Sequence, residues 1–150
     1  MKRLQHLGLA SVLLALALQS CGLWQKPRAG SCPKMPKLEV VSLAMIPDPL
    51  PEARKINQWR VIVRSDSSEL CQATLGIVEA DTEKWVTPEQ KSELSLGTND
   101  VTFYALSDYR LSGTEVCFEL IAHIGEDKIS VDSRRRFCAR TIDRGWWSMR

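Results

Sequence analysis

Hydrophobic and polar residues alternate along most of the chain after residue 37. The clearest case is Asn57–Ser65, where Trp59, Val61 and Val63 fall on one side of the backbone. A period of two predicts a β-strand with one buried face. No segment carries the apolar stripe of a ten-residue helix. The pattern predicts about seven strands, at Leu38–Met45, Asn57–Ser65, Cys71–Val78, Ser92–Leu96, Val101–Leu106, Glu115–Ile124 and Arg135–Thr141.

Turn-forming residues separate these strands. Pro47-Asp48-Pro49 ends the first, because proline lacks the amide donor of a strand ladder. Gly97-Thr98-Asn99-Asp100 is predicted to form the turn between the fourth and fifth. Short alternating strands with turn signals predict a single antiparallel β-sandwich of two sheets over residues 38–142. A small closed barrel is the alternative.

The order of these features resembles a known class of module. A proline-rich bend (IPDPLPE) follows the first strand, a tryptophan-bearing strand (INQWRVIVRSD) comes next, and a Leu-Gly turn leads into an aromatic strand (LGTNDVTFYAL). The segment from about residue 38 to residue 141 is similar to immunoglobulin-like modules of the CARDB and fibronectin type III kind. This resemblance implies an all-β, immunoglobulin-like sandwich of the sort found in many extracytoplasmic bacterial proteins.

The N-terminal segment predicts export. Lys2 and Arg3 precede the uncharged apolar run Leu7–Leu18, which is shorter than the roughly 20 residues of a membrane-spanning helix. This order of charge and apolar residues is typical of a secretory signal. Leu18-Gln19-Ser20-Cys21 resembles the lipobox of bacterial lipoproteins. The resemblance implies a signal peptide at residues 1–20, cleavage before Cys21, and lipidation of that residue on its thiol and its new amine.

A lipidated Cys21 would hold the protein at a membrane surface, because two or more acyl chains make such binding stable. In the families that the lipobox resembles, Gly22 in place of Asp implies the outer membrane of an organism with two membranes. The alternative is ordinary signal cleavage with a free Cys21. Residues 21–37 are rich in proline and glycine and are predicted to form an extended tether.

Four cysteines remain after Cys21, and an even number in an exported chain predicts two disulfides. They are Cys32, Cys71, Cys117 and Cys138. Alternation favours one pairing. If Glu115–Ile124 and Arg135–Thr141 form a hairpin that turns near Asp127-Lys128, Cys117 lies opposite Cys138.

That register also places Phe118 opposite Phe137, and Val116 opposite Ala139. The phenylalanines then point inward together, whereas both cysteines lie on the outer face. Cys32 is left to pair with Cys71. A zinc site would favour closely spaced CxxC or histidine partners, and a redox pair would favour CxxC, so neither is expected.

The composition and motifs argue against several functions. The net charge is only +2, too small an excess for a general nucleic-acid binder. The sequence contains no GxSxG, HExxH or glycine-rich phosphate loop. No catalytic residue, metal or cofactor is therefore predicted, and we expect the protein to act by binding.

Two C-terminal features are candidates for binding. Arg136 and Arg140 share the outward face of the last predicted strand, where they could meet an anionic partner, although such charges also occur on solvated edge strands. Residues 143–150 form an aromatic and basic tail that holds Trp146 and Trp147. Either both tryptophans fold back over the sandwich, or one stays exposed as an anchor for a partner or membrane.

The expected function is that of a lipid-anchored scaffold subunit of a cell-envelope assembly, bound to the bilayer through Cys21 and to an envelope protein. The alternative is a lipoprotein that captures polysaccharide or a small molecule on its sandwich loops. An inhibitor, or an enzyme with its site on the loops, is a third possibility.

Overall fold

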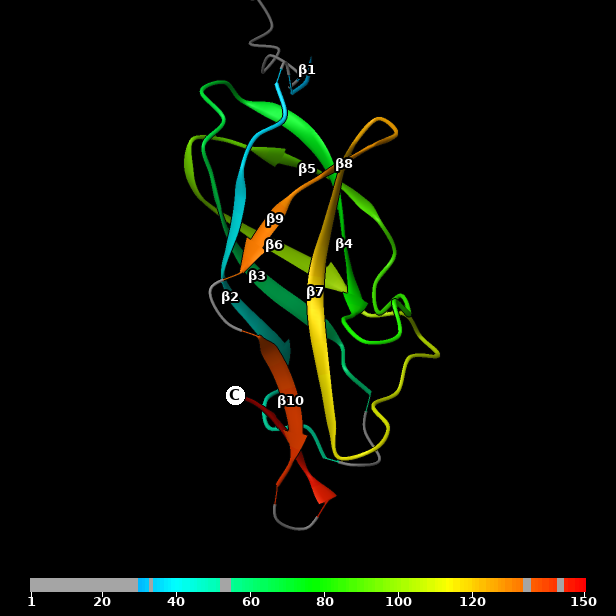
Figure 1. The fold of residues 1–150 in the computed structure, drawn as a ribbon. Helices are drawn as coiled ribbons and strands as arrows, with labels where there is room; N and C mark the ends of the chain where they lie inside the picture. Colours follow the sequence, from blue (N-terminus) through cyan, green and yellow to red (C-terminus); the bar gives the residue numbers. More distant parts are fainter. Residues whose placement is uncertain (1–29, 33, 52–54, 134–135, 143–144) are drawn as a thin grey trace, which may run out of the picture.

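A computed structural model of the protein describes residues 30–32, 34–51, 55–133, 136–142 and 145–150. Within them the chain forms strands in two sheets, so the predicted all-β sandwich is confirmed (Figure 1). Residues 1–29, with the signal peptide and Cys21, lie outside the described residues. The strands are β1 (Gly30–Ser31), β2 (Leu38–Ile46), β3 (Gln58–Ser65), β4 (Cys71–Glu79), β5 (Gln90–Leu94), β6 (Gly97–Tyr104), β7 (Glu115–Ile124), β8 (Asp127–Ile129), β9 (Val131–Ser133), β10 (Phe137–Thr141) and β11 (Trp147–Met149).

The larger sheet has the order β1-β4-β7-β10-β11, with β5 also paired to β4 and β8 to β7. The smaller sheet has the order β6-β3-β2-β9. The seven predicted strands correspond to β2 to β7 and β10. If the seven strands are lettered A to G in chain order, β2, β3 and β6 are strands A, B and E, and β4, β7 and β10 are strands C, F and G. The observed pairings β2-β3-β6 and β4-β7-β10 are then the A-B-E and C-F-G pairings of immunoglobulin-like sandwiches.

The core lies between the two sheets, as alternation requires. Trp59, Val61 and Val63 of β3 are fully buried. The Trp59 ring packs against Phe118 of the opposite sheet, with ring centroids 4.4 Å apart. The prediction that β3 turns this side inward is therefore confirmed. Burial of these apolar side chains supplies the main stabilisation of the sandwich.

The predicted turn at Gly97–Asp100 is wrong, because these residues begin β6. The chain reverses just before them, at Ser95-Leu96. The Asn99 side chain explains the error. Its oxygen accepts a hydrogen bond from the Ser95 amide at 2.9 Å, and its nitrogen donates to the Ser95 carbonyl at 3.0 Å. The turn-forming residue thus stabilises the turn from within the following strand.

The predicted register between β7 and β10 is confirmed, but the predicted hairpin turn is wrong. Cys138 pairs with Cys117 and Phe137 with Phe118. Asp127 lies in β8, however, and β7 reverses at Gly125, which has a φ of 61°. The next strand, β9, crosses to the smaller sheet and runs parallel to β2 before the chain returns as β10.

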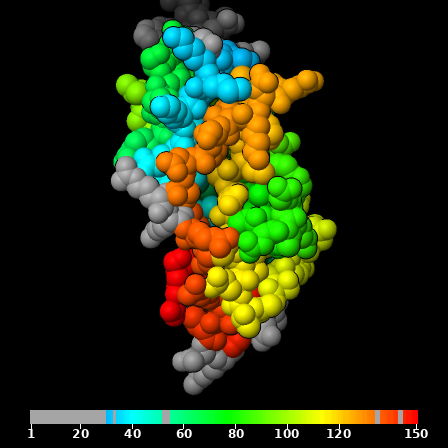
Figure 2. Space-filling view, in the orientation of Figure 1, coloured from blue at the N-terminus to red at the C-terminus, as the bar shows by residue number. Residues whose placement is uncertain are grey.

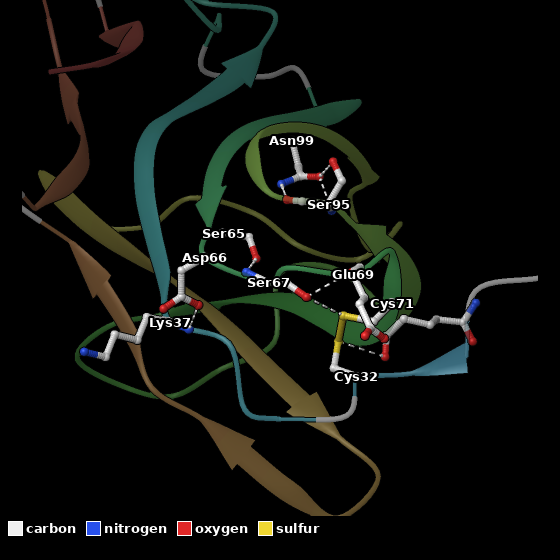
Figure 3. The surroundings of a disulfide bond; sticks show 10 residues. Cys32, Lys37, Ser65, Asp66, Ser67, Glu69, Cys71, Ser95 and Asn99 are labelled. Atoms are coloured by element: carbon white, nitrogen blue, oxygen red, sulfur yellow. Dashed lines mark hydrogen bonds between the residues drawn. A yellow bond between two sulfur atoms is a disulfide. The ribbon is translucent and has the colours of Figure 1, made fainter.

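The first described residues are attached to the sandwich rather than separate from it. Gly30 pairs with Cys71 in a parallel ladder, and Cys32 forms a disulfide with Cys71 (Figure 3). The Lys37 amide donates to Asp66 at 2.7 Å. Within the part of the chain that the structure describes, strand pairing is thus present from Gly30 onward, inside the segment predicted as a tether.

Candidate functional site

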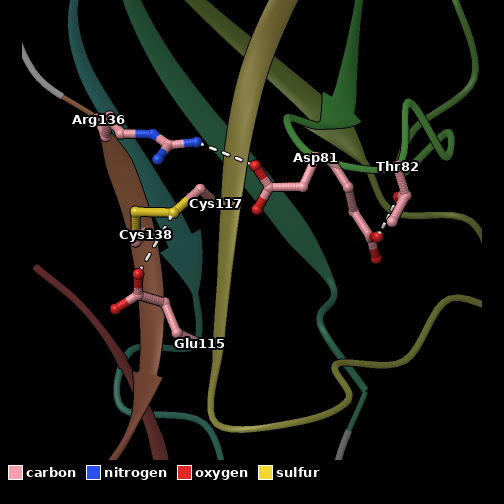
Figure 4. A network of polar contacts seen from close by, with 7 residues as sticks. Asp81, Thr82, Glu115, Cys117, Arg136 and Cys138 are labelled. Atoms are coloured by element: carbon pink, nitrogen blue, oxygen red, sulfur yellow. Dashed lines mark hydrogen bonds and ion pairs between the residues drawn. A yellow bond between two sulfur atoms is a disulfide. The ribbon is translucent and has the colours of Figure 1, made fainter.

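The two arginines that the sequence singled out lie on either side of Cys138 along the chain, Arg136 just before β10 and Arg140 within it. Figure 4 shows Arg136 near the disulfide between Cys117 and Cys138, on the outer side of the larger sheet. Arg140 lies opposite Glu115 in the β7–β10 ladder, two positions from the bonded pair Cys117 and Cys138. Residues two apart share a face, so the cysteines lie on the outward face, as predicted. Each is nevertheless less than a tenth exposed. The Ala80 amide, which donates to the Cys117 carbonyl at 2.8 Å, brings a connecting loop beside them.

Each arginine has a carboxylate partner. Arg136 pairs with Asp81 at 3.0 Å, and Arg140 pairs with Glu115. All four side chains are exposed, so each pair is worth little in stability. Because each arginine is paired with a carboxylate, this face presents both positive and negative charges to a binding partner. It is not an uninterrupted basic strip. Arg134, Arg135 and Arg144 lie outside the described residues.

Three residues of types that can bind metals meet at the same place, namely Glu115, Cys117 and Cys138. The two sulfurs are bonded to each other, so neither is available as a thiolate ligand. Glu115 is engaged by Arg140. These three residues therefore form a disulfide next to the ion pair between Glu115 and Arg140.

The C-terminal tryptophans have separate environments. Trp147 is buried in β11, whereas Trp146, in the turn that precedes it, is 40% exposed. Of the two arrangements that the sequence allowed, the structure has the one with a single exposed tryptophan. The segment predicted as a tail thus contains a strand of the larger sheet.

Strand β11 is hydrogen-bonded on both sides. It pairs with β10, and the Trp147 amide and carbonyl bond to the carbonyl and amide of Leu50, at 2.8 and 2.7 Å. Leu50 belongs to the connection between β2 and β3, so the C-terminal strand joins this connection to the larger sheet. The C-terminal residues lie at the opposite end of the molecule from residues 30–37 (Figures 1 and 2).

Other exposed apolar side chains lie toward the same end. Ile46 ends β2 and Tyr104 ends β6, and both pair with Gln58 at the start of β3. Tyr104 is 66% exposed and Ile46 is 38% exposed. For brevity we call these two residues and Trp146 the distal cluster, a name that refers to their exposure and not to mutual contact. Sequence reasoning missed Ile46 and Tyr104, although both lie at strand ends on the polar side of the alternation.

A buried tyrosine secures the connection between β6 and β7 near this end. The Tyr109 hydroxyl donates to Glu79 at 2.8 Å, and the Lys84 ammonium lies 5.3 Å from the centre of its ring. Burial, together with the hydrogen bond to the Glu79 carboxylate, raises the pKa of Tyr109 well above its ordinary value. The contact holds this connection to the last residue of β4.

A hollow of about 410 Å³ opens between the sheets where β10 begins. Its apolar wall includes Val40 and Leu43 from β2 and Phe118 from β7, and Arg136 and Glu119 bring charge to it. Mixed apolar and polar linings of this size occur in small-molecule sites. No sequence pattern pointed to this hollow, because its lining comes from β2, β7, β9 and the start of β10, which only the fold brings together.

Comparisons of this chain with protein-family models, curated proteins and solved structures give no match. Across the described residues, no helix has the length and apolar character needed to span a bilayer.

Proposed function

We propose that the protein is a lipid-anchored, extracytoplasmic binding protein that serves as a scaffold subunit of a cell-envelope assembly. One observation carries the proposal. The disulfide Cys32–Cys71 attaches the start of the described chain to one end of the sandwich, whereas the C-terminal strand, which Trp146 precedes, lies at the other. A domain anchored through Cys21 would therefore direct Tyr104 and Trp146 away from the bilayer.

The chemistry at the two ends supports this role. Disulfides form and persist in oxidising compartments, so the pairs Cys32–Cys71 and Cys117–Cys138 favour a location outside the cytoplasm. Exposed tyrosine and tryptophan are enriched at protein interfaces, since each combines a large apolar surface with a polar group. The neighbouring ion pair between Arg140 and Glu115 would add a polar rim to such an interface.

Membrane attachment is tested with labelled palmitate. The wild-type protein should incorporate the label and remain with membranes, and Cys21→Ser should incorporate none, because the acylated thiol is absent. Wild-type protein without label would contradict the anchor.

Partner binding is tested by copurification from a gentle detergent extract. Trp146→Ala should remove a stoichiometric partner, whereas Val41→Ala should retain it. Val41 is a suitable control because it is also 40% exposed but lies at a bulge within β2, away from the C-terminal turn. Deletion of residues 145–150 is a poor test, since it removes the buried Trp147. Equal recovery of the partner with both variants would exclude Trp146 from the interface.

The hollow beside β10 favours the second function, capture of a small molecule or a sugar of an envelope polysaccharide. Under this alternative, envelope saccharides should raise the melting temperature of the purified protein. Leu43→Trp, which would fill the hollow from β2, should abolish that shift. A protein that shows no shift and copurifies with a stoichiometric partner is a scaffold instead.

A further inference from the structure

The most exposed aliphatic side chains among the described residues all lie at the end of the sandwich where the chain enters it. They are Leu96, Met35 and Leu70, with exposed fractions of 69%, 54% and 49%. We call these three residues the proximal cluster. Each lies outside a strand, so none is explained by the alternation that buries the core.

Strand pairing brings these residues to one end. Leu70 precedes Cys71, which pairs with both Gly30 and Leu94. Leu96 follows shortly after Leu94. Met35 lies shortly after Cys32, whose disulfide to Cys71 joins the same strands (Figure 3).

Two further strand pairings connect the region of the proximal cluster to β2. Gly97 pairs with Ser65, which in turn pairs with Leu38. A hollow of about 810 Å³ lies along these strands, and its lining includes Leu96, Lys37 and Val131. Leu96, the most exposed residue of the proximal cluster, therefore lines a recess to which apolar side chains contribute.

We infer that the proximal cluster contacts the membrane bilayer, so that the domain rests on the membrane through this end. The inference depends on the lipid anchor of the proposed function. Cys21 is nine residues before Gly30, and nine extended residues span at most about 30 Å. The acyl chains on Cys21 would therefore keep this end of the sandwich within that distance of the bilayer surface.

The side-chain chemistry favours lipid over a protein partner. The proximal cluster is wholly aliphatic, whereas the distal cluster contains both Tyr104 and Trp146. Aliphatic side chains gain most from transfer into an apolar phase and bring no polar group that must be satisfied there. Interfacial segments that bind membranes insert their apolar residues at the boundary between headgroups and acyl chains.

Charge contributes little to the contact. Exposed Lys34 and Lys37 lie near the cluster, but so do exposed Asp66 and Glu69. Because the signs are mixed, anionic lipid should not be required. This distinguishes insertion of apolar residues from electrostatic attraction, which a basic surface would show.

The experiment places a photoreactive benzophenone amino acid at position 96 of the full, lipidated protein in neutral phosphatidylcholine vesicles. Position 104 is a matched control, because Leu96 and Tyr104 are 69% and 66% exposed. Leu96 immediately precedes β6 and Tyr104 is its last residue, so the two positions are separated by about 26 Å along the strand. We expect lipid adducts from position 96, the same adducts from position 70, and none from position 104.

The inferred membrane contact would be overturned by lipid adducts of equal yield from positions 96 and 104. It would also be overturned if position 96 gave no adducts, or if position 70 gave none. Adducts from position 96 that appear only when anionic lipid is added would overturn it as well. Palmitate labelling of the same sample separates this inference from the proposed function. Label without adducts refutes the membrane contact alone, whereas absence of label refutes the anchor and the contact together.

Discussion

The indole ring of Trp85 lies against Gly76 so closely that no other residue fits at position 76 without displacement. A Cβ at that position would lie 2.6 Å from Cζ3 of Trp85. Trp85 belongs to the connection after β4 and pairs with Val78 through an isolated bridge. Gly76 thus allows an aromatic ring to cover the outer side of a central strand.

Gly76→Ala should displace this ring. We expect a loss of about 1 kcal/mol of unfolding free energy, the lower range for overpacking, because Trp85 is 38% exposed and has room to move. Urea denaturation measures the loss. The control is Gly30→Ala, whose Cβ would meet no atom within 4 Å. Equal stability of the two variants would show that the position of the Trp85 ring does not require glycine at position 76.

The two tryptophans of the C-terminal turn and strand should respond differently to substitution. Trp147→Ala removes a buried ring and should cost about 3 kcal/mol, as large-to-small core substitutions do. Trp146→Ala changes an exposed residue and should alter stability by less than about 0.5 kcal/mol. Urea unfolding of both variants with the disulfides intact distinguishes them. A larger loss for Trp146→Ala would mean that its ring, too, is needed by the fold.

Removal of the Cys117–Cys138 disulfide should destabilise the domain. The bond closes a loop with a sequence separation of 21 residues, so the chain-entropy relation predicts a loss of about 3 kcal/mol in the paired serine variant. Chemical denaturation measures this loss. Mass analysis of peptides under non-reducing conditions checks the pairing, and a peptide that joins Cys71 to Cys117 would contradict the β7–β10 register.

Tyr109 should make stability depend on pH in the alkaline range. Its pKa is raised in the folded state by burial and by its hydrogen bond to Glu79. The contribution of Tyr109 to the free energy of unfolding is therefore complete below the ordinary tyrosine pKa of about 10. This contribution is lost as the pH rises above that value. Tyr109→Phe should therefore lose less stability than wild type between about pH 8 and pH 11.

A spectroscopic measurement isolates this group. The sequence has two tyrosines, so Tyr104→Phe leaves Tyr109 as the only source of phenolate absorbance. That absorbance should appear only as the protein unfolds at alkaline pH. Ionisation of Tyr109 at about pH 10 in the folded protein would contradict the buried hydrogen bond.

Asp100 should contribute stability that is lost at acid pH. The hydrogen bond from Arg60 to its carboxylate, with Nε at 3.0 Å from both oxygens, lowers the pKa of Asp100. A lowered pKa gives stability at pH values above the ordinary value of about 4, and this is lost as the pH falls through the folded value. Asp100→Asn should be less stable than wild type at about pH 7, and the difference should shrink as the pH falls below about 4.

A double-mutant cycle with Arg60→Gln attributes this effect to the pair. If the pair acts alone, Asp100→Asn in the Arg60→Gln background should have no further effect at neutral pH. An undiminished effect would assign the role of Asp100 to another neighbour.

The sequence alone determined the strands and much of their orientation. Alternation has a period of two, so it specified which side of β3 enters the core and which residues of β7 face β10. Cys117 and Cys138 face each other because Phe118 and Phe137 must both point inward in that register. These are local properties of a pleated backbone, and they require no knowledge of the distant chain.

The tertiary structure decided how distant segments combine. Alternation does not specify which sheet a strand joins, so the crossing of β9 to β2 could not be predicted. The choice of Trp147 over Trp146 for burial depended on Leu50, a residue far away in the sequence. Likewise, the carboxylate beside Arg136 comes from Asp81, in the connection after β4. The distal and proximal clusters form for the same reason, because only the pairing of strands brings their residues to common ends of the sandwich.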